Sequence, residues 1–163
     1  MTNEIALFSA RNTPLLSQGS TMDLLARAPS LYAHIKVYAD GGENGLHSHP
    51  QEDHLFFILQ GRATFSLGSG STLVAERNQG VIVPRGNSYS FVNSGAGNLI
   101  LLRIGTPTTP DLAKDVEGHP GVPLAAVIRQ DAEGREFRGD EARNKTGAQR
   151  GVKSGALFDP SPA

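Results

Sequence analysis

Residues 41–61 read GGENGLHSHPQEDHLFFILQG, and this stretch decides both the expected fold and the expected site. It holds three of the five histidines of the chain, His47, His49 and His54. Glycines frame it at both ends, and a dense apolar run, LFFIL, directly follows the last histidine. Short apolar runs bounded by glycine are typical of strands joined by tight turns. The stretch therefore predicts two adjacent strands that carry imidazole side chains.

The chain on both sides of this stretch has a similar rhythm. Residues 31–39 alternate between aliphatic and amphipathic side chains with a period of two, which predicts a strand. Short strands are also expected over 4–9, 62–67, 73–76, 81–83, 88–92 and 99–104. The segment 21–27 fits either a helical turn or a strand. Regularly spaced short strands with turns between them indicate an all-β fold, an antiparallel barrel or jelly-roll sandwich.

Length and composition limit the remaining possibilities. The 163 residues fit one domain, which we expect to be a barrel over 31–105 with N-terminal strands over 1–30. Residues 106–163 are rich in proline, glycine and charge and predict an irregular C-terminal arm. The net charge of −1 gives no basic footprint for nucleic acid or for a membrane surface. Since cysteine is absent and no signal peptide or long apolar run is seen, we expect a cytoplasmic protein.

The spacing of the histidines predicts a metal site. His47 and His49 are two residues apart, which places both imidazoles on one face of a strand. After a short polar turn His54 begins the next strand, so three neutral nitrogens can converge on a first-row divalent metal. The simpler alternative is an exposed, histidine-rich turn. We expect His34 at the edge of the core or in solvent, with a place in the pocket lining as the alternative, and His119 in a loop.

These residues resemble the cupin superfamily. Its first motif matches Gly41, His47, His49 and Gly61 in spacing, with His54 in the slot where the family has glutamate. Its second motif matches Pro84, Gly86 and Asn93, with Tyr89 in place of the family histidine. Because the family also tolerates a spacing shorter by one residue, Asp53 is a rival to His54 as the third ligand.

The resemblance implies a metal-dependent enzyme with iron, zinc or nickel as cofactor. Three histidines without a carboxylate would leave the metal more positive, which favours a small anionic, oxygen-rich substrate. The expected activity is an Fe-dependent dioxygenase. The alternatives are a non-redox zinc or nickel isomerase, cyclase or lyase, and a small-molecule-binding protein without catalysis. Tyr89 is expected to ligate the metal as phenolate, to donate a proton, or to fill the space of the missing histidine.

Further residues are expected around the site. Arg103 or Arg62 is the candidate partner of a substrate carboxylate. Aromatic side chains are the candidate pocket walls, although core packing is the simpler role for each: Tyr38, Phe56, Phe65 and Phe91. The resemblance also implies a homodimer, for which the segments 2–30 and 122–128 are the expected contacts.

Overall fold

A computed structural model describes residues 5–11, 13–39, 45–108, 128–130, 136–138 and 151–160, and all regular structure in these ranges is β. The N-terminal half contains β1 (Pro14–Gln18), β2 (Ser20–Ala28), β3 (Leu31–Tyr38), β4 (His47–Ser48), β5 (Glu52–Gln60), β6 (Arg62–Leu67) and β7 (Thr72–Glu76). The remainder contains β8 (Gly80–Val83), β9 (Tyr89–Asn93), β10 (Leu99–Pro107), β11 (Ile128–Gln130), β12 (Glu136–Arg138) and β13 (Gly151–Leu157).

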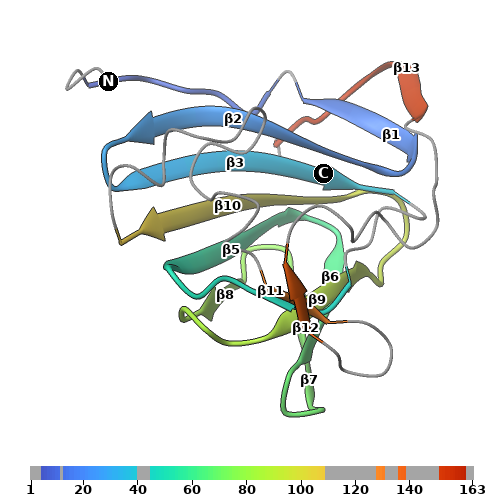
Figure 1. The fold of residues 1–163 in the computed structure, drawn as a ribbon. Coiled ribbons are helices and arrows are strands. Elements are labelled where there is room, and N and C mark those ends of the chain that lie inside the picture. Colours follow the sequence, from blue (N-terminus) through green and yellow to red (C-terminus); the bar gives the residue numbers. More distant parts are fainter. Residues whose placement is uncertain are drawn as a thin grey trace.

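The strands form two large antiparallel sheets and one small one. The five-stranded sheet has the order β2-β3-β10-β5-β8, and the six-stranded sheet has the order β12-β11-β4-β9-β6-β7. Figure 1 shows β2, β3, β10 and β5 side by side in one curved layer. The third sheet pairs β1 with β13. The predicted all-β architecture is therefore confirmed.

The predicted strands lie close to the observed ones, with two differences, and the choice left open at 21–27 is resolved. The segment 21–27 is a strand, β2, and it pairs with β3 from Ser20↔Tyr38 to Ala28↔Leu31. The short strand expected over 4–9 is wrong for residues 5–9, which form no strand in the described chain. In the C-terminal region the described residues add three strands, while most of the expected contact segment 122–128, like His119, lies outside the described residues.

Gly61 closes the opening stretch and makes the turn from β5 to β6. Its backbone has φ +83°, a conformation that residues with a Cβ rarely adopt. A Cβ at this position would also lie 3.0 Å from the carbonyl oxygen of Asn98. The chain therefore needs glycine here to bring β6 back against the sheet that β5 belongs to.

Two hydrophobic clusters hold the sheets together. The larger one fills the space between the two big sheets and includes Tyr38, Phe56, Ile58, Phe65, Phe91, Leu99 and Leu101. The smaller one lies on the other face of β3, where Ile35 and Val37 pack with Leu16 of β1 and with Phe158. Both faces of β3 are thus buried. For this reason His34 is only 1% exposed, and the expectation of a histidine at the core edge or in solvent is wrong.

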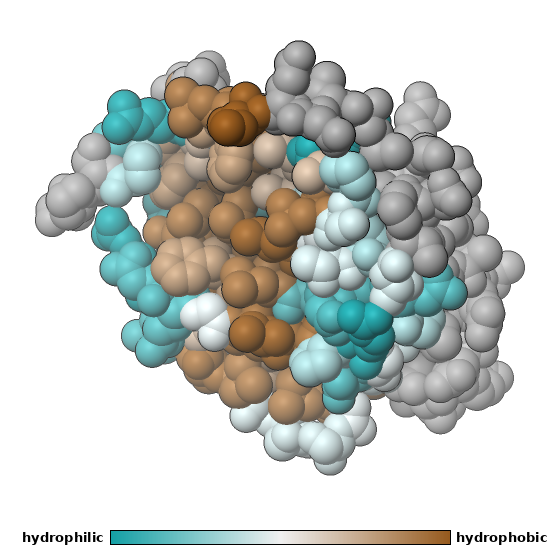
Figure 2. Space-filling model, turned by 90° about the vertical axis from the view of Figure 1, so that its left-hand side faces the viewer, coloured by the Kyte–Doolittle hydropathy of each residue, from teal (hydrophilic) through white to brown (hydrophobic). Residues whose placement is uncertain are grey.

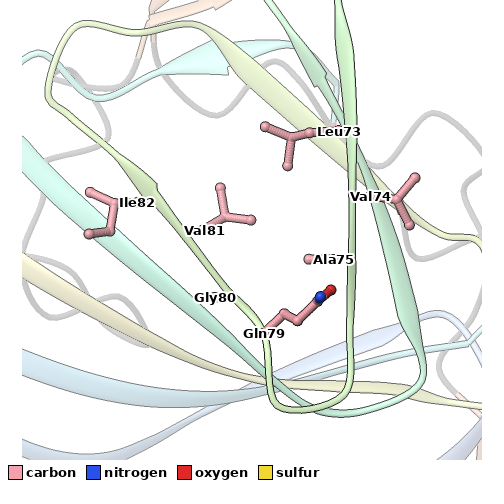
Figure 3. Close-up of a pocket in the computed structure, with 7 residues that line it drawn as sticks. All are labelled: Leu73, Val74, Ala75, Gln79, Gly80, Val81 and Ile82. Carbon is pink, nitrogen blue, oxygen red and sulfur yellow. The ribbon is translucent and has the colours of Figure 1, made fainter.

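Strands β7 and β8 are edge strands of different sheets, and a cleft lies between them. Figure 3 shows Leu73 and Val81 pointing toward each other across this cleft, while Val74 and Ile82 point away from it. The cleft is lined mainly by aliphatic side chains and is remote in sequence from the histidines. No helix within the described ranges is long and apolar enough to cross a membrane.

Candidate metal centre

The site lies where β5 begins, and strand alternation builds it. Buried and half-buried residues alternate along β5, so that Glu52, His54 and Phe56 share the inward face. His47 lies on β4 and pairs with Tyr89 of β9, while His49 follows β4 directly. The two sheets thereby bring His47, His49, His54 and Tyr89 to one end of the barrel interior, where all four are 9% exposed or less.

The imidazole and phenol rings of these four residues are close neighbours. The ring centroids of His49 and His54 are 4.2 Å apart, those of His47 and His49 are 5.1 Å apart, and those of His47 and Tyr89 are 4.6 Å apart. The Nδ1 atom of His47 lies 2.8 Å from the carbonyl oxygen of Gly45. A backbone bond of this kind orients a histidine and directs its other nitrogen, Nε2, as a ligand.

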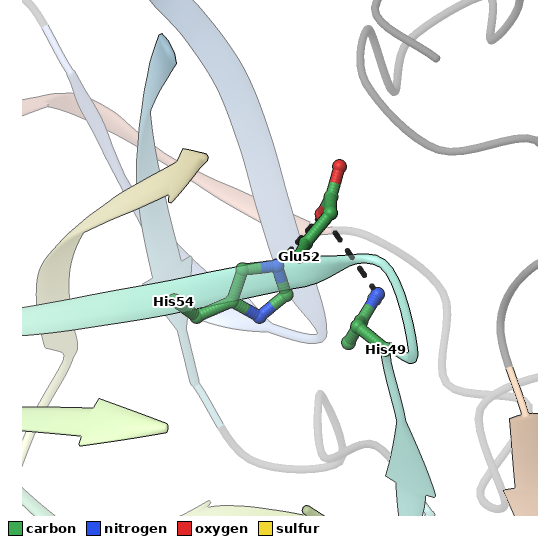
Figure 4. A group of neighbouring side chains, drawn as sticks. All are labelled: His49, Glu52 and His54. Atoms are coloured by element: carbon green, nitrogen blue, oxygen red, sulfur yellow. Dashed lines mark hydrogen bonds and ion pairs between the residues drawn. The ribbon is translucent and has the colours of Figure 1, made fainter. Parts of the chain in front are cut away.

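Glu52 also belongs to the site, and the sequence analysis missed it. Ligand atoms of His49, Glu52 and His54 all lie within 4.8 Å of one another, and Figure 4 shows the three side chains converging. Glu52 Oε2 is 2.8 Å from His54 Nε2 and 4.0 Å from His49 Nδ1. The parity of Glu52 with His54 and Phe56 was the available signal, but the motif spacing pointed to positions 53 and 54.

The carboxylate changes the expected charge of the centre. The donors predicted from the sequence were neutral imidazoles and a phenol, and Glu52 adds a carboxyl group to them. Burial raises the pKa of Glu52 to about 7, although the Tyr32 hydroxyl and the Arg103 charge act in the opposite direction. Burial also lowers the pKa of His49 and His54 well below the usual range, so both imidazoles are neutral at pH 7 and free to act as ligands.

The donor set fits a divalent transition metal. Two neutral imidazoles and one carboxylate are a known ligand combination for such ions. In the described structure His49 Nδ1 and Glu52 Oε1 are buried without a hydrogen-bond partner, which is costly unless another group completes them. A metal held by His49, Glu52 and His54 would satisfy such atoms.

Arg103 of β10 also reaches His54. Its Nη2 donates to His54 Nε2 at 2.8 Å and to the Tyr32 hydroxyl at 2.9 Å. A guanidinium can only donate, so Arg103 favours an unprotonated Nε2 on His54, whereas Glu52 Oε2, 2.8 Å from the same nitrogen, favours a protonated one. With Nε2 unprotonated, Nδ1 carries the proton toward the Tyr89 hydroxyl, 3.1 Å away. A metal that binds through His54 Nε2 must therefore compete with Arg103 for one lone pair.

Asp53 lies on the outer side of β5, where it is bonded to Arg85, so it is not directed at the site. Arg62 is exposed and donates to the carbonyl oxygen of Ser94, away from the histidines. The four aromatic residues considered as pocket walls pack against one another in the core, which was the simpler role expected for them: Tyr38, Phe56, Phe65 and Phe91. Burial raises the pKa of Tyr89, so its phenol is protonated at neutral pH.

Comparison with known proteins agrees with this geometry. Residues 34–105 match the family model described as "Cupin domain". The chain therefore contains a cupin domain, and this domain carries every residue of the candidate centre. No match was found among curated proteins.

Solved structures show the same fold. The cupin domain of Schizosaccharomyces pombe Cnp3 is 27% identical, with a TM-score of 0.51 over 56% of this chain and 67% of that one. KdgF from Halomonas sp. is 18% identical, with a TM-score of 0.52 over 57% of this chain and 84% of that one. A Klebsiella pneumoniae protein with a double-stranded β-helix domain is also 18% identical, with a TM-score of 0.51 over 55% and 74%. The latter two likenesses concern the fold alone.

Proposed function

We propose that this chain is a metal-dependent cupin enzyme that oxidises a small anionic, oxygen-rich molecule, in the manner of an iron-dependent dioxygenase. The observation that supports the metal is the buried group of His49, Glu52 and His54. The anionic substrate is supported by the buried guanidinium of Arg103 beside them. Two histidines and one carboxylate are the ligand set of many non-haem Fe(II) oxygenases. Bound iron would supply activation of O2 beside the substrate, and both oxygen atoms would enter the product, so that no further reductant is consumed.

The residues around the metal ligands orient them. The Tyr32 hydroxyl donates to Glu52 Oε2 at 2.7 Å and holds this oxygen beside His54 Nε2, 2.8 Å away. Phe56 packs beneath His54, with ring centroids 5.8 Å apart, and excludes water from that side. Such supporting contacts determine how tightly a metal is held.

The test compares two neighbouring carboxylates. Glu52→Gln keeps the shape of the side chain but removes its charge, whereas Asp53→Asn does the same on the outer face of β5. We expect the purified wild-type protein and Asp53→Asn to contain iron, and Glu52→Gln to bind it at least about tenfold more weakly. Elemental analysis and metal titration measure this. Oxygen uptake with small carboxylates and enolisable diketones then tests the reaction, and iron without such uptake would overturn the oxygenase assignment.

A second candidate function rests on the chain of contacts from Tyr89 to Glu52. His54 bridges them, with Nδ1 3.1 Å from the phenol oxygen and Nε2 2.8 Å from the carboxylate. If the imidazole proton moves to Nε2, His54 accepts from Tyr89 and donates to Glu52, which permits acid–base catalysis by the phenol. This favours a zinc- or nickel-dependent lyase, isomerase or cyclase. Zinc or nickel without oxygen uptake, and a Tyr89→Phe variant that keeps its metal but loses turnover, would select it.

A further inference from the structure

Lys36 is a buried amine that neither proposed reaction uses, and burial, together with the charge of Arg103, lowers its pKa to about 7. It lies on the inward face of β3 and is only 9% exposed. Its ammonium group lies 5.2 Å from the ring centroid of Tyr38 and 5.7 Å from that of Phe91. Within the described part of the chain it has no carboxylate at ion-pair distance, so the two rings are its main compensation.

Arg103 lies beside Lys36 on the same inner wall. Leu101 of β10 pairs with Lys36 and Arg103 pairs with His34, so the two cations are diagonal neighbours on adjacent strands. Arg103 Nε is buried without a hydrogen-bond partner, although Nη2 is fully used. Both basic side chains on this wall therefore have N–H groups that can donate a hydrogen bond to an anion.

Basic side chains outnumber acidic ones on this inner wall of the barrel, among the residues that the structure describes. Among the described inward residues of this wall, two side chains are basic, and the acidic side chain nearest to them is Glu52, 3.6 Å from Arg103. If Glu52 serves a metal, even this charge is shared with a further cation. A buried amine without a partner loses its charge easily, and an anionic ligand beside both basic groups would favour the charged form of Lys36 and offset the cost of burying it.

We propose that Lys36 and Arg103 form a subsite for the carboxylate of a small organic acid, on the β3–β10 wall directly beside His54 and Glu52. The inference rests on the proposed function in that it names the anionic group of the same substrate. A carboxylate fits because its two oxygens can accept from an ammonium and from a guanidinium N–H at the same time. The reacting part of the molecule then faces His49, Glu52 and His54.

Metal-free protein provides the test, because binding there cannot come from ligation to a metal. Chelator-treated wild-type protein is titrated calorimetrically with oxalate, malonate and succinate at constant ionic strength. We expect binding of at least one of these acids, and an affinity at least about tenfold lower in Lys36→Met. Arg27→Met is the matched control, since it removes one positive charge from an exposed position on β2 and should bind as the wild type does.

Folding of the variant is checked by thermal unfolding without ligand. Lys36→Met replaces a buried ammonium with an apolar side chain and should unfold at the same temperature as the wild type or higher. If it does not fold, Lys36→Gln replaces it in the titration. Unchanged affinity in the Lys36 variant, no binding of any of the three acids, or binding of inorganic phosphate alone would each overturn the subsite. If a carboxylate binds and the binding needs Lys36, but the protein as purified contains no iron, only the oxygenase is refuted and the subsite stands.

Discussion

Arg103 is the residue whose contacts decide how strongly a metal can bind. Its Nη2 uses the lone pair of His54 Nε2, and it lies 3.6 Å from Glu52 Oε2. A divalent ion bound to the same two atoms would therefore face a full positive charge at close range. Two like charges about 4 Å apart repel by roughly 4 kcal/mol at the effective dielectric constant of a protein surface.

Arg103→Met should therefore increase metal affinity. Methionine keeps much of the length of the side chain and removes the charge, so we expect zinc to bind at least about tenfold more tightly in a competition titration with a chromophoric chelator. Arg85→Met is the control, because Arg85 is bonded to Asp53 on the outer face and its loss should leave zinc affinity unchanged. Weaker zinc binding in Arg103→Met would mean that the guanidinium supports the ligands rather than competing with the ion.

Single residues also show where prediction from sequence succeeded and where it stopped. Histidine spacing was enough to gather His47, His49 and His54, because strand parity is a local property. Glu52 shares that parity and was still missed, since the motif spacing placed the acidic slot elsewhere. The contact between Arg103 and His54 joins residues 49 positions apart, and it depends on the pairing of β10 with β5. No local pattern specifies such a register.

At the scale of elements, the pairing of β10 with β3 and β5 positions the site. Gly105 lies between Tyr32 of β3 and His54 of β5 in this register. The Tyr32 ring crosses the space where a side chain at position 105 would be, because a Cβ there would lie 2.1 Å from Tyr32 Cζ. Glycine at this position thus allows the Tyr32 hydroxyl to reach Glu52.

Gly105→Ala should move Tyr32 and weaken its bond to Glu52. Overpacking of a filled interior costs about 1–3 kcal/mol, which urea unfolding can measure. In a Tyr32→Leu background the same substitution should cost much less, because the ring atoms that clash with Cβ are absent. An equal cost in both backgrounds would show that the strain comes from the β10 backbone and not from the ring.

The positions of the strands could be predicted because they depend on local sequence, whereas the pairing register depends on residues far apart in the chain. Residues 31–38 formed the expected strand because alternation of side-chain type reflects burial on the two faces. The short strand expected over 4–9 had a similar composition, but residues 5–9 pair with no other strand in the described chain. Whether a short apolar segment becomes a strand depends on an available edge, and sequence alone does not show which edges are free.

At the scale of the whole molecule, one face remains apolar. Cross-strand pairs align aliphatic and aromatic side chains on the outer face of the five-stranded sheet: Ile104↔Leu55, Leu55↔Ile82 and Leu102↔Phe57. Ile82, on the edge strand β8, is 70% exposed. Figure 2 shows a band of apolar surface along one side of the molecule, and the N-terminal Ile5 and Leu7 are also fully exposed.

We propose that a second copy of the chain covers the outer face of this sheet, which makes the protein a homodimer. The face continues from the buried β3 residues across β10 and β5 to an open edge, and such edges are usually protected by pairing or by cover. Ile82→Glu places a charge on the face without disturbing the interior. We expect it to shift the protein from dimer to monomer in light scattering coupled to size-exclusion chromatography, with a folded circular-dichroism spectrum and an unfolding temperature that no longer rises with protein concentration. Val74→Glu, an equally drastic change at a 55% exposed position on the other sheet, should leave the dimer intact. A monomeric wild-type protein, or dissociation by both variants alike, would refute this interface.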